Sequence, residues 1–243
     1  MTASMVLFIS DLHLTPERPL PVALFYRFIK ERAEQAQALY ILGDFFEAWV
    51  GDDDLAQPFH RDIAAALKAL SVQGVAVFFL PGNRDFLVGP VFADAAGLML
   101  LGDPTEVQLF GVPTLLTHGD SFCTDDVAYQ DFRRQVRDPA WQQQFLAQPL
   151  AQRHALAKGL RERSEHAKAD KKPEIMDVNN AAISEALDAY PVTRIIHGHT
   201  HRPARHEHQR NGQTCERWVL PDWYENGGYL VCDERGCRLS AFP

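Results

Sequence analysis

The sequence predicts a single α/β domain built in layers, and two patterns along the chain carry that prediction. Short apolar runs alternate with amphipathic stretches of helical periodicity through the first half of the chain, which is typical of strands connected by helices. A polar cluster also follows the end of each of the first three apolar runs. Because ligands bind beyond the carboxyl ends of strands in open α/β sheets, these clusters should converge on one site.

Each expected element follows from its local pattern. Apolar runs bounded by turn residues predict these strands: Val6–Ile9, Leu39–Leu42, Val75–Leu80, Leu98–Leu101, Thr105–Phe110, Val112–Thr117, Arg194–Ile196, Trp218–Leu220 and Tyr229–Val231. Helical periodicity predicts helices over Pro21–Ala36 and Leu55–Leu70, and a third helix begins near Asp177 and runs through Ala189. Asn226-Gly227-Gly228 predicts a hairpin turn between the last two strands.

The composition changes after Asp125. Residues 125–172 are rich in Gln, Arg and Ala with isolated Leu and Phe, which indicates helices inserted into a domain that spans 1–243. Within Leu150–Lys172, seven Lys or Arg stand against three Asp or Glu, so this segment carries +4 and the rest of the chain −12. An ordinary amphipathic helix whose basic face is solvated would show the same pattern of isolated apolar and basic residues, so this alternative remains open.

The bulk composition excludes several classes of protein. With 46% hydrophobic and 23% charged residues the chain is globular, and its net charge of −8 argues against a general nucleic-acid coat. The N-terminus lacks the basic start of a signal peptide, and no segment approaches the roughly 20 apolar residues of a membrane helix, so we expect a cytoplasmic protein. The four cysteines form no CxxC pair, and we expect them to be reduced thiols, with a disulfide between two of them as the alternative that the sequence leaves open.

Polar residues at the strand ends form one candidate metal site. Residues two apart on an extended segment project to the same side, so Asp11-x-His13 and His197-x-His199 each aim two ligands at one place. Together with the other candidates, the set offers carboxylate, imidazole and amide ligands, which suit Mn²⁺, Fe²⁺ or Zn²⁺. Its seven members are Asp11, His13, Asp44, Asn83, His118, His197 and His199. Seven ligands are too many for one ion and predict two, with one carboxylate bridging them.

Most of these residues have a blander explanation when taken singly. Asp44 follows Gly43 and Asn83 follows Pro81-Gly82, so either could be a turn residue. A lone histidine such as His118 is often a satisfied, half-buried side chain. Two imidazoles that flank a glycine serve packing poorly, however, and all the candidates stand at successive strand ends. As a set they favour the metal site.

The motifs DLH, GDFF, GNRD, THGD and HGHTH, in this order, resemble the calcineurin-like metallophosphoesterase superfamily. That resemblance implies a four-layered α/β/β/α sandwich with an inserted helical lid. It also implies a first metal held by Asp11, His13, Asp44 and His199. It implies a second metal held by Asp44, Asn83, His118 and His197, with Asp44 as the bridge.

A closer resemblance covers essentially the whole chain. GDFFEAWVGDD, GNRDFL, HGDSFCTDD, RERS, IMDVN and HGHTHRP are similar to the UDP-2,3-diacylglucosamine hydrolases. The resemblance implies Mn²⁺-dependent cleavage of the pyrophosphate, which releases UMP and the lipid A precursor 2,3-diacylglucosamine 1-phosphate, and we expect activated water to attack the α-phosphorus. Because such an acylated substrate resides in a membrane, we also expect peripheral attachment to the cytoplasmic face of the inner membrane through the basic, leucine-bearing insert. It places catalysis on Asp44, Arg84 and His118, and substrate contacts on Asn83, Arg84, Asp126, Arg161, Ser164, Lys168, Lys171 and His197. Lys168 departs from relatives that carry Asn there.

Arg84 stands where many calcineurin-like enzymes carry a histidine that could protonate the leaving group. Arginine keeps its proton at neutral pH, so it cannot act as that acid, but its planar fork can hold phosphate oxygens. A surface arginine that pairs with Asp85 is the simpler alternative. Two other functions also remain open: a nuclease or nucleotide phosphodiesterase with the same metal core, and a non-catalytic metal-bound scaffold. The sequence predicts no oligomeric state.

Overall fold

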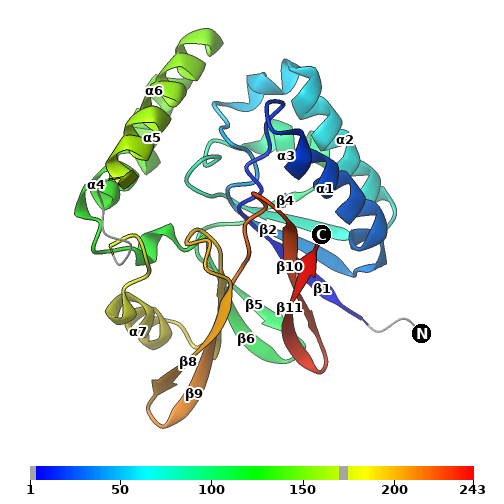
Figure 1. The fold of residues 1–243 in the computed structure, drawn as a ribbon, viewed down its shortest axis with the longest axis vertical. Coiled ribbons are helices and arrows are strands. Elements are labelled where there is room, and N and C mark those ends of the chain that lie inside the picture. The colour runs from blue at the N-terminus through cyan, green and yellow to red at the C-terminus, as the bar shows by residue number, and fades with distance from the viewer. Residues whose placement is uncertain (1–3, 170–174) are drawn as a thin grey trace.

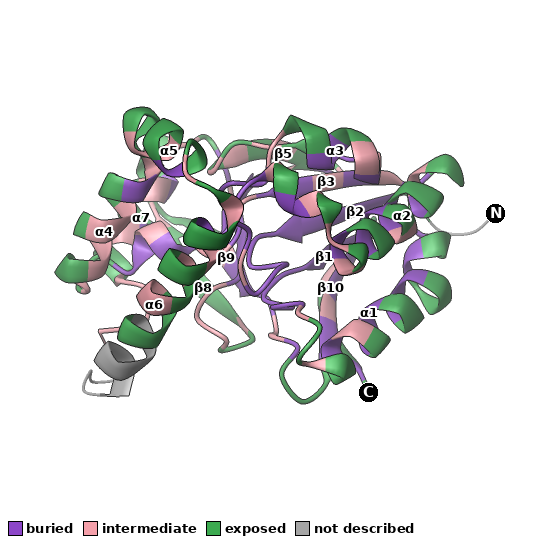
Figure 2. Ribbon diagram, turned by 90° about the horizontal axis from the view of Figure 1, so that it is seen from above, coloured by how far each residue is buried: buried purple, intermediate pink, exposed green. Residues whose placement is uncertain are grey.

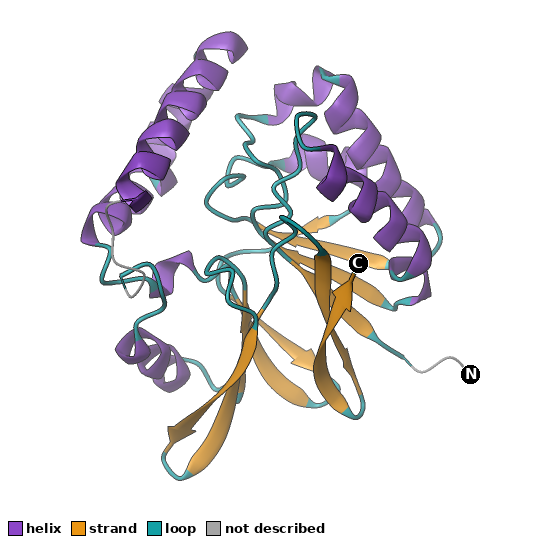
Figure 3. Cartoon of the chain, in the orientation of Figure 1, coloured by secondary structure: helices purple, strands orange, loops and turns teal. Residues whose placement is uncertain are grey.

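Two β-sheets stack face to face, and helices cover their outer faces (Figures 1 and 3). The structure is a computed structural model that describes residues 4–169 and 175–243, without the side chains of 164–169. In spatial order the first sheet contains β11 (Gly236–Phe242), β10 (Gly227–Asp233), β1 (Val6–Ile9), β2 (Ala38–Leu42), β3 (Ala76–Leu80) and β4 (Met99–Leu100). The second contains β5 (Thr105–Leu109), β6 (Val112–Leu116), β7 (Arg194–His197), β9 (Gln213–Val219) and β8 (Ala204–Arg210).

The helices fall into three groups in Figure 1. On the first sheet lie α1 (Pro19–Glu31), α2 (Pro58–Val72) and α3 (Pro90–Ala96), and against the second lies α7 (Asn180–Ala189). The third group stands to one side of both sheets and contains α4 (Val127–Arg137), α5 (Pro139–Leu146) and α6 (Leu150–Ala169). Short 3₁₀ turns span Ala33–Gln35, Asp52–Ala56 and Asp120–Phe122.

Side-chain alternation along the strands separates the layers. On β1, Leu7 and Ile9 pack into the core beneath α1–α3, whereas Val6 and Phe8 face the second sheet, because successive strand residues point to opposite faces. The outer face of the second sheet packs on α7 through residues such as Ile195. The buried strands at the centre and the exposed outer faces of the helices are seen in Figure 2. The predicted four-layered α/β/β/α sandwich is therefore confirmed.

A buried arginine attaches the third group of helices to the core. Arg153 on α6 is only 2% exposed, and its guanidinium donates to the carbonyl oxygen of Gln148 at 2.9 Å and to that of Val50. It also pairs with the carboxylate of Asp53. The next residue, His154, places Nε2 2.9 Å from the carboxylate of Asp54. This end of α6 is thus fixed to the loop that follows β2.

The predicted C-terminal hairpin is wrong. β9 belongs to the second sheet and β10 to the first, and the residues between them cross from one sheet to the other. The hairpins are instead β8–β9 and β10–β11. Gly228 lies inside β10, where a Cβ would stand 2.5 Å from the ring of Pro221, so the glycine serves close packing of the crossover. A glycine pair that packs in this way has the same sequence signature as a turn.

Other elements also differ from the sequence-based expectation. The patterns missed α3, β8 and β11; β8 in particular is a polar edge strand without alternating apolar residues. The helix expected to begin near Asp177 begins at Asn180, with Asn179 as its N-cap. No helix within 4–169 or 175–243 combines the length and apolar character needed to cross a membrane.

The expectation that every cysteine is a reduced thiol is wrong for one pair. Cys232 on β10 and Cys237 on β11 form a disulfide, because the hairpin places them directly opposite each other with Cα atoms 4.1 Å apart. Cys123 and Cys215 are free and buried. The sequence could not reveal the pair, since the hairpin itself was not predicted.

Candidate active site

The segments that follow five strands converge where the two sheets meet. Asp11 and His13 follow β1, Asp44 follows β2, and Asn83 follows β3, all in the first sheet. From the second sheet, His118 follows β6, and His197, at the end of β7, leads to His199. These loops gather between the two large groups of helices (Figure 3). The structure thus brings together side chains that are far apart in the sequence, as the strand-end pattern predicts.

Asp44 lies between histidines from the two sheets. Its Oδ2 is 3.9 Å from His13 Nε2, and its Oδ1 is 3.6 Å from His118 Nε2. The side-chain oxygen of Asn83 lies 2.9 Å from both His118 Nε2 and His199 Nδ1. One carboxylate therefore reaches toward both halves of the site.

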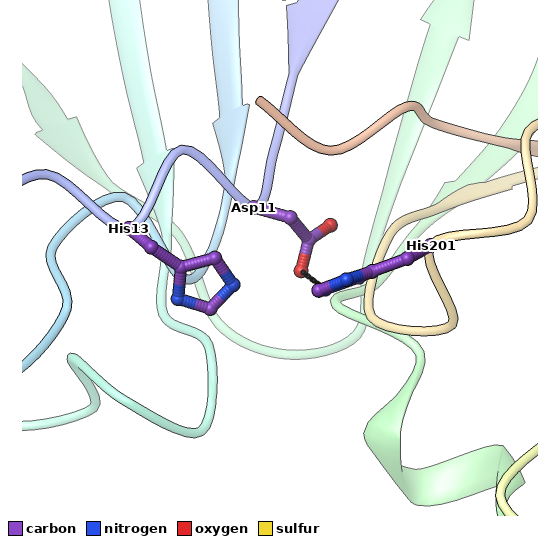
Figure 4. Close-up of side chains that lie close together, drawn as sticks. All are labelled: Asp11, His13 and His201. Atoms are coloured by element: carbon purple, nitrogen blue, oxygen red, sulfur yellow. Dashed lines mark ion pairs between the residues drawn. The ribbon is translucent and has the colours of Figure 1, made fainter. Parts of the chain in front are cut away.

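Asp11 forms the centre of a second group, together with a histidine that the sequence reasoning did not name. His201 Nε2 is 3.3 Å from Asp11 Oδ1, and one ring nitrogen of His13 points toward the same carboxylate (Figure 4). The other oxygen, Oδ2, accepts hydrogen bonds from Ser10 Oγ at 2.6 Å and from the backbone N–H of His199 at 2.9 Å. The third histidine of HGHTH, two residues after His199, was the available sequence signal.

Backbone strain is concentrated at this site. Seven described non-glycine residues have a positive φ, and five of them belong to the site: Asp11, His13, Asp44, His199 and His201. L-amino acids rarely adopt this conformation, and it persists where surrounding structure enforces it for function. The strain includes His201, which supports counting it among the site residues.

Close approach of the backbone completes the positioning of Asp11. A Cβ on Gly198 would lie 2.3 Å from Asp11 Oδ2 and from Ser10 Oγ. Only glycine therefore lets the loop after β7 pass so near the carboxylate. Gly198 is therefore required for this close packing, independently of the role of the two histidines that flank it.

The residues present fit divalent cations. Among the described residues, no group completes a hydrogen bond of good geometry to Asp11 Oδ1 or to either ring nitrogen of the buried His13, although buried polar atoms are normally paired. In the same part of the chain, two groups have ligand atoms that all lie within 4.8 Å of one another: Asp11, His13 and His201, and Asp11, Asp44 and His118. Carboxylates and imidazoles are ligands for Mn²⁺, Fe²⁺ and Zn²⁺. Asp11 is common to both groups.

The electrostatics of the site also favour bound positive charge. Burial by itself lowers the pKa of His118, but the carboxylates of Asp44, Asp11 and Asp120 raise it to about 9. Burial and the neighbouring His118 lower the pKa of His199 to about 3, so this imidazole is neutral, the form that binds a metal. The buried carboxylates thus attract a positive charge. The imidazole of His199 is neutral and does not supply that charge, whereas a bound cation would.

His197 does not join either group in the part of the chain that the structure describes. Its Nε2 is 3.0 Å from Arg217 Nη1 and its Nδ1 is 2.9 Å from the carbonyl oxygen of Gly198. Burial, with the charge of Arg217, lowers its pKa to about 3. The imidazole packs on the backbone of Gly119, next to His118. It therefore lies beside the site, with its nitrogens engaged elsewhere.

Asp85 organises two of the loops and was also missed by the sequence reasoning. Its buried carboxylate accepts backbone N–H groups from Gly82 at 2.8 Å and Phe45 at 2.7 Å, and from Asp44 and Phe46 at 3.3 Å. Burial and the Asp44 carboxylate raise its pKa to about 7. Asp85 thereby holds the loops after β2 and β3 against each other. Its role in the GNRD motif is positioning by hydrogen bonds to the backbone.

A cavity of about 840 Å³ opens beside the metal-ligand cluster. Asn83 and Arg84 are among its lining residues, and the backbone N–H of Arg84 donates to Asp44 Oδ1 at 2.8 Å. Its apolar wall includes Trp49, Leu87, Phe132, Val136, Trp141, Phe145 and Leu160. Its cationic lining includes Arg18, Lys158, Arg161 and Arg163. A ligand with an anionic group and a long apolar part matches this combination.

The remaining residues named from the sequence lie on or near the third group of helices. Asp126 is the N-cap of α4 and accepts the backbone N–H of Tyr129 at 3.2 Å. Arg161 lines the cavity, and its Nε is 3.1 Å from Glu47 Oε1. The side chains of Ser164 and Lys168, and the whole of Lys171, lie outside the described residues.

Comparison with known proteins gives matches over most of the chain. Residues 4–203 match the family model described as calcineurin-like phosphoesterase. A protein of Aromatoleum aromaticum named UDP-2,3-diacylglucosamine hydrolase is 53% identical over 230 residues, which cover 95% of this chain and 94% of that protein. A protein of the same name from Xanthomonas campestris is 51% identical over 240 residues, with 96% and 97% covered. Among solved structures, an archaeal phosphodiesterase aligns with 98% of this chain and 99% of its own, at 12% identity and a TM-score of 0.47.

Proposed function

Because the chain belongs to the calcineurin-like phosphoesterase family, we propose that it hydrolyses the pyrophosphate of UDP-2,3-diacylglucosamine to UMP and 2,3-diacylglucosamine 1-phosphate, a step of lipid A biosynthesis. The observation that carries the proposal is the cavity of about 840 Å³ whose lining combines an apolar wall with Asn83 and Arg84, beside the proposed metal ligands. A substrate with both a diphosphate and acyl chains fits that arrangement. The proposal is also supported by the two relatives described above, which are 53% and 51% identical to this chain and are named UDP-2,3-diacylglucosamine hydrolase.

The metal site would hold two Mn²⁺ ions. The residues that would hold the first are Asp11, His13, Asp44 and His199, and those that would hold the second are Asp44, Asn83, His118 and His197. His201 Nε2 lies 3.3 Å from Asp11 Oδ1. Bound divalent cations acidify water and neutralise charge on phosphate oxygens. His197 would have to turn from Arg217 to join the second set.

The chain's own residues direct the reaction at the α-phosphorus. Arg84 lines the cavity next to the metal ligands, where its fork can hold phosphate oxygens as charge builds on them. Water attacks the α-phosphorus and the bond to the bridging oxygen breaks. The leaving oxygen belongs to the sugar 1-phosphate, so it needs little protonation, which agrees with an arginine in place of an acid.

We infer that the insertion at about 125–172, of which the structure describes 125–169, acts as a lid on the 1–243 domain and contributes further substrate contacts. Asp126, Arg161, Ser164, Lys168 and Lys171 are the proposed contacts on this lid, and His197 is another on the main body. The lid also binds the acyl chains through the apolar wall of the cavity.

The proposal includes peripheral attachment of the enzyme to the cytoplasmic face of the inner membrane through this lid. Leu146, at the end of α5, is 41% exposed, and Leu156 on α6 is 43% exposed. Lys158 and Arg163, also on α6, are exposed as well. A basic residue near an anionic surface adds about 1 kcal/mol of attraction. We expect the protein to sediment with vesicles that contain anionic lipid and to be released by high salt. Equal recovery with neutral vesicles would contradict this arrangement.

The activity is tested by incubating the purified chain with UDP-2,3-diacylglucosamine, with and without Mn²⁺. We expect stoichiometric UMP and 2,3-diacylglucosamine 1-phosphate only when the metal is present. Hydrolysis of nucleotide diphosphates without the acylated sugar at an equal kcat/KM would instead indicate a general nucleotide pyrophosphatase. Metal binding without any hydrolysis would indicate a scaffold.

Replacing Leu160 with aspartate should separate acyl binding from chemistry. Leu160 is half-buried and lines the cavity, so a carboxylate there removes apolar contact and must lose hydration when an acyl chain binds. Since burying a leucine is worth about 1.5–3 kcal/mol, KM for the diacylated substrate should rise about tenfold or more. Turnover of a small phosphodiester such as bis(4-nitrophenyl) phosphate should stay unchanged.

Ala155→Asp, on the exposed side of the same helix, is the matched control and should leave both substrates unaffected. Equal losses on the two substrates in the Leu160→Asp enzyme would remove the acyl chains from this cavity.

A further inference from the structure

Glu47 is a buried carboxylate at the edge of the metal site that the reaction described above does not use. It follows β2 in the loop that carries Asp44, and only 7% of it is exposed. Its backbone N–H donates to the carbonyl oxygen of Leu14 at 3.1 Å, next to His13. A carboxylate with so little exposure is costly unless other groups stabilise its charge. The groups around Glu47 therefore indicate its role.

The two oxygens of Glu47 face different parts of the molecule. Oε2 lies 3.7 Å from His13 Nδ1 and 3.8 Å from Arg18 Nη1. Oε1 lies 3.1 Å from Arg161 Nε on helix α6. His13 Nε2, the other ring nitrogen, faces Asp44 in the metal site. Glu47 thus stands between a metal ligand and the helix that lines the substrate cavity.

Aromatic and cationic side chains close this arrangement on its outer side. The Tyr224 ring stacks on His13, with centroids 5.4 Å apart and planes 15° apart. The Arg18 guanidinium lies 4.3 Å from the centre of the Tyr224 ring and also faces Glu47. The imidazole of His13 is therefore confined on one face by Tyr224 and at Nδ1 by Glu47.

We propose that Glu47 is a positioning residue that couples the metal ligand His13 to helix α6 through Arg161. A carboxylate beside the outer nitrogen of a metal-bound histidine fixes the tautomer with a proton on that nitrogen and strengthens the other nitrogen as a ligand. The His13–Glu47 distance is longer than a hydrogen bond, and a shift of about 1 Å would form one. The same carboxylate pairs with Arg161, so a change in the position of His13 alters the contact with α6, and a change at Arg161 alters the contact with His13.

This coupling is reciprocal by thermodynamic necessity. If metal binding draws Glu47 into a fixed position, it stabilises the turn of α6 around Arg161; if that turn is docked, the metal binds more tightly. The opposite end of α6 is already fixed by Arg153, so the coupling acts on the part after Gly159. The inference rests on the proposed metal site but does not depend on the substrate.

Binding of Mn²⁺ to the metal-free protein, followed by the electron paramagnetic resonance of free Mn²⁺, tests the first half of the proposal. Glu47→Gln keeps the shape and removes the charge, and it should weaken Mn²⁺ binding about 10- to 100-fold, as outer carboxylates of metal-bound histidines do. Glu47→Asp should lose less. Glu17→Gln, an exposed carboxylate that lines the same cavity, should bind Mn²⁺ like the wild type.

Amide hydrogen exchange tests the second half and separates positioning from general structural support. In the wild type, Mn²⁺ should slow exchange in the turn Leu160–Arg163, whereas Glu47→Gln and Arg161→Gln should each abolish that response with their melting temperatures preserved. Wild-type Mn²⁺ affinity in Glu47→Gln would overturn the proposal, as would an intact exchange response in Arg161→Gln. Both measurements use metal without substrate, so failure of the proposed hydrolase activity would appear separately. If Glu47→Gln unfolds, Glu47→Asp supplies the same comparisons.

Discussion

Replacing Asp11 with asparagine is expected to lower kcat about 10³-fold or more while the protein remains folded. Asp11 belongs to both groups of candidate metal ligands, and bound cations would supply several kcal/mol of transition-state stabilisation, each 1.4 kcal/mol of which is worth a factor of about ten. An asparagine would turn its oxygen toward Ser10 and the backbone N–H of His199, which donate to Asp11 Oδ2. Its NH₂ group would then face the metal site and repel a cation.

The measurement is steady-state hydrolysis at saturating Mn²⁺, with circular dichroism to establish that the fold is intact. Asp62→Asn, an exposed carboxylate on α2, is the control for loss of one negative charge and should keep wild-type rates. Near-normal turnover by the folded Asp11→Asn enzyme would remove Asp11 from the metal site.

Replacing Arg84 with lysine is expected to lower kcat about 100-fold and to change KM little. Both side chains carry a positive charge, but only the guanidinium presents parallel N–H groups that match two phosphate oxygens. Loss of one such donor set in an electrostatically organised site costs a factor of about 10²–10³. The backbone N–H of Arg84, which donates to Asp44, is unaffected by the substitution.

The Arg84 effect should therefore be specific to the reaction. Mn²⁺ affinity should be unchanged in Arg84→Lys, and Arg134→Lys, an exposed arginine on α4, should behave as the wild type. If Arg84→Lys raised KM and left kcat intact, Arg84 would contribute to substrate binding only.

The central part of the candidate site could be predicted because its residues follow apolar runs that identify β-strands in the sequence. Asp11, Asp44 and Asn83 stand directly after strands whose periodicity is plain, and parallel strands bring their carboxyl ends together. His201 was missed because the His197-x-His199 pattern already supplied two candidate ligands. Nothing in the sequence shows that the loop after β7 brings a third histidine beside Asp11. Glu47 and Asp85 were missed because most of their partners lie far away in the sequence: His13 and Arg161 for Glu47, and the backbone of the loop after β2 for Asp85.

The elements that could not be predicted depend on tertiary packing. Gly228 was interpreted as a turn residue, yet it lies in a strand because Pro221 packs against it. The polar edge strand β8 has no apolar alternation, since its pairing with β9 comes from backbone hydrogen bonds. The Cys232–Cys237 disulfide depends on the register of a hairpin that no local pattern revealed.

The central claim is that two divalent cations bind where the loops of the two sheets meet. The most direct test is the anomalous diffraction of crystals grown with Mn²⁺, measured at the manganese absorption edge. We predict two peaks about 3.5–4 Å apart, with the Asp44 carboxylate touching both and Asp11 beside the one nearer His13. A single peak, or peaks that do not contact Asp11 and Asp44, would contradict the account.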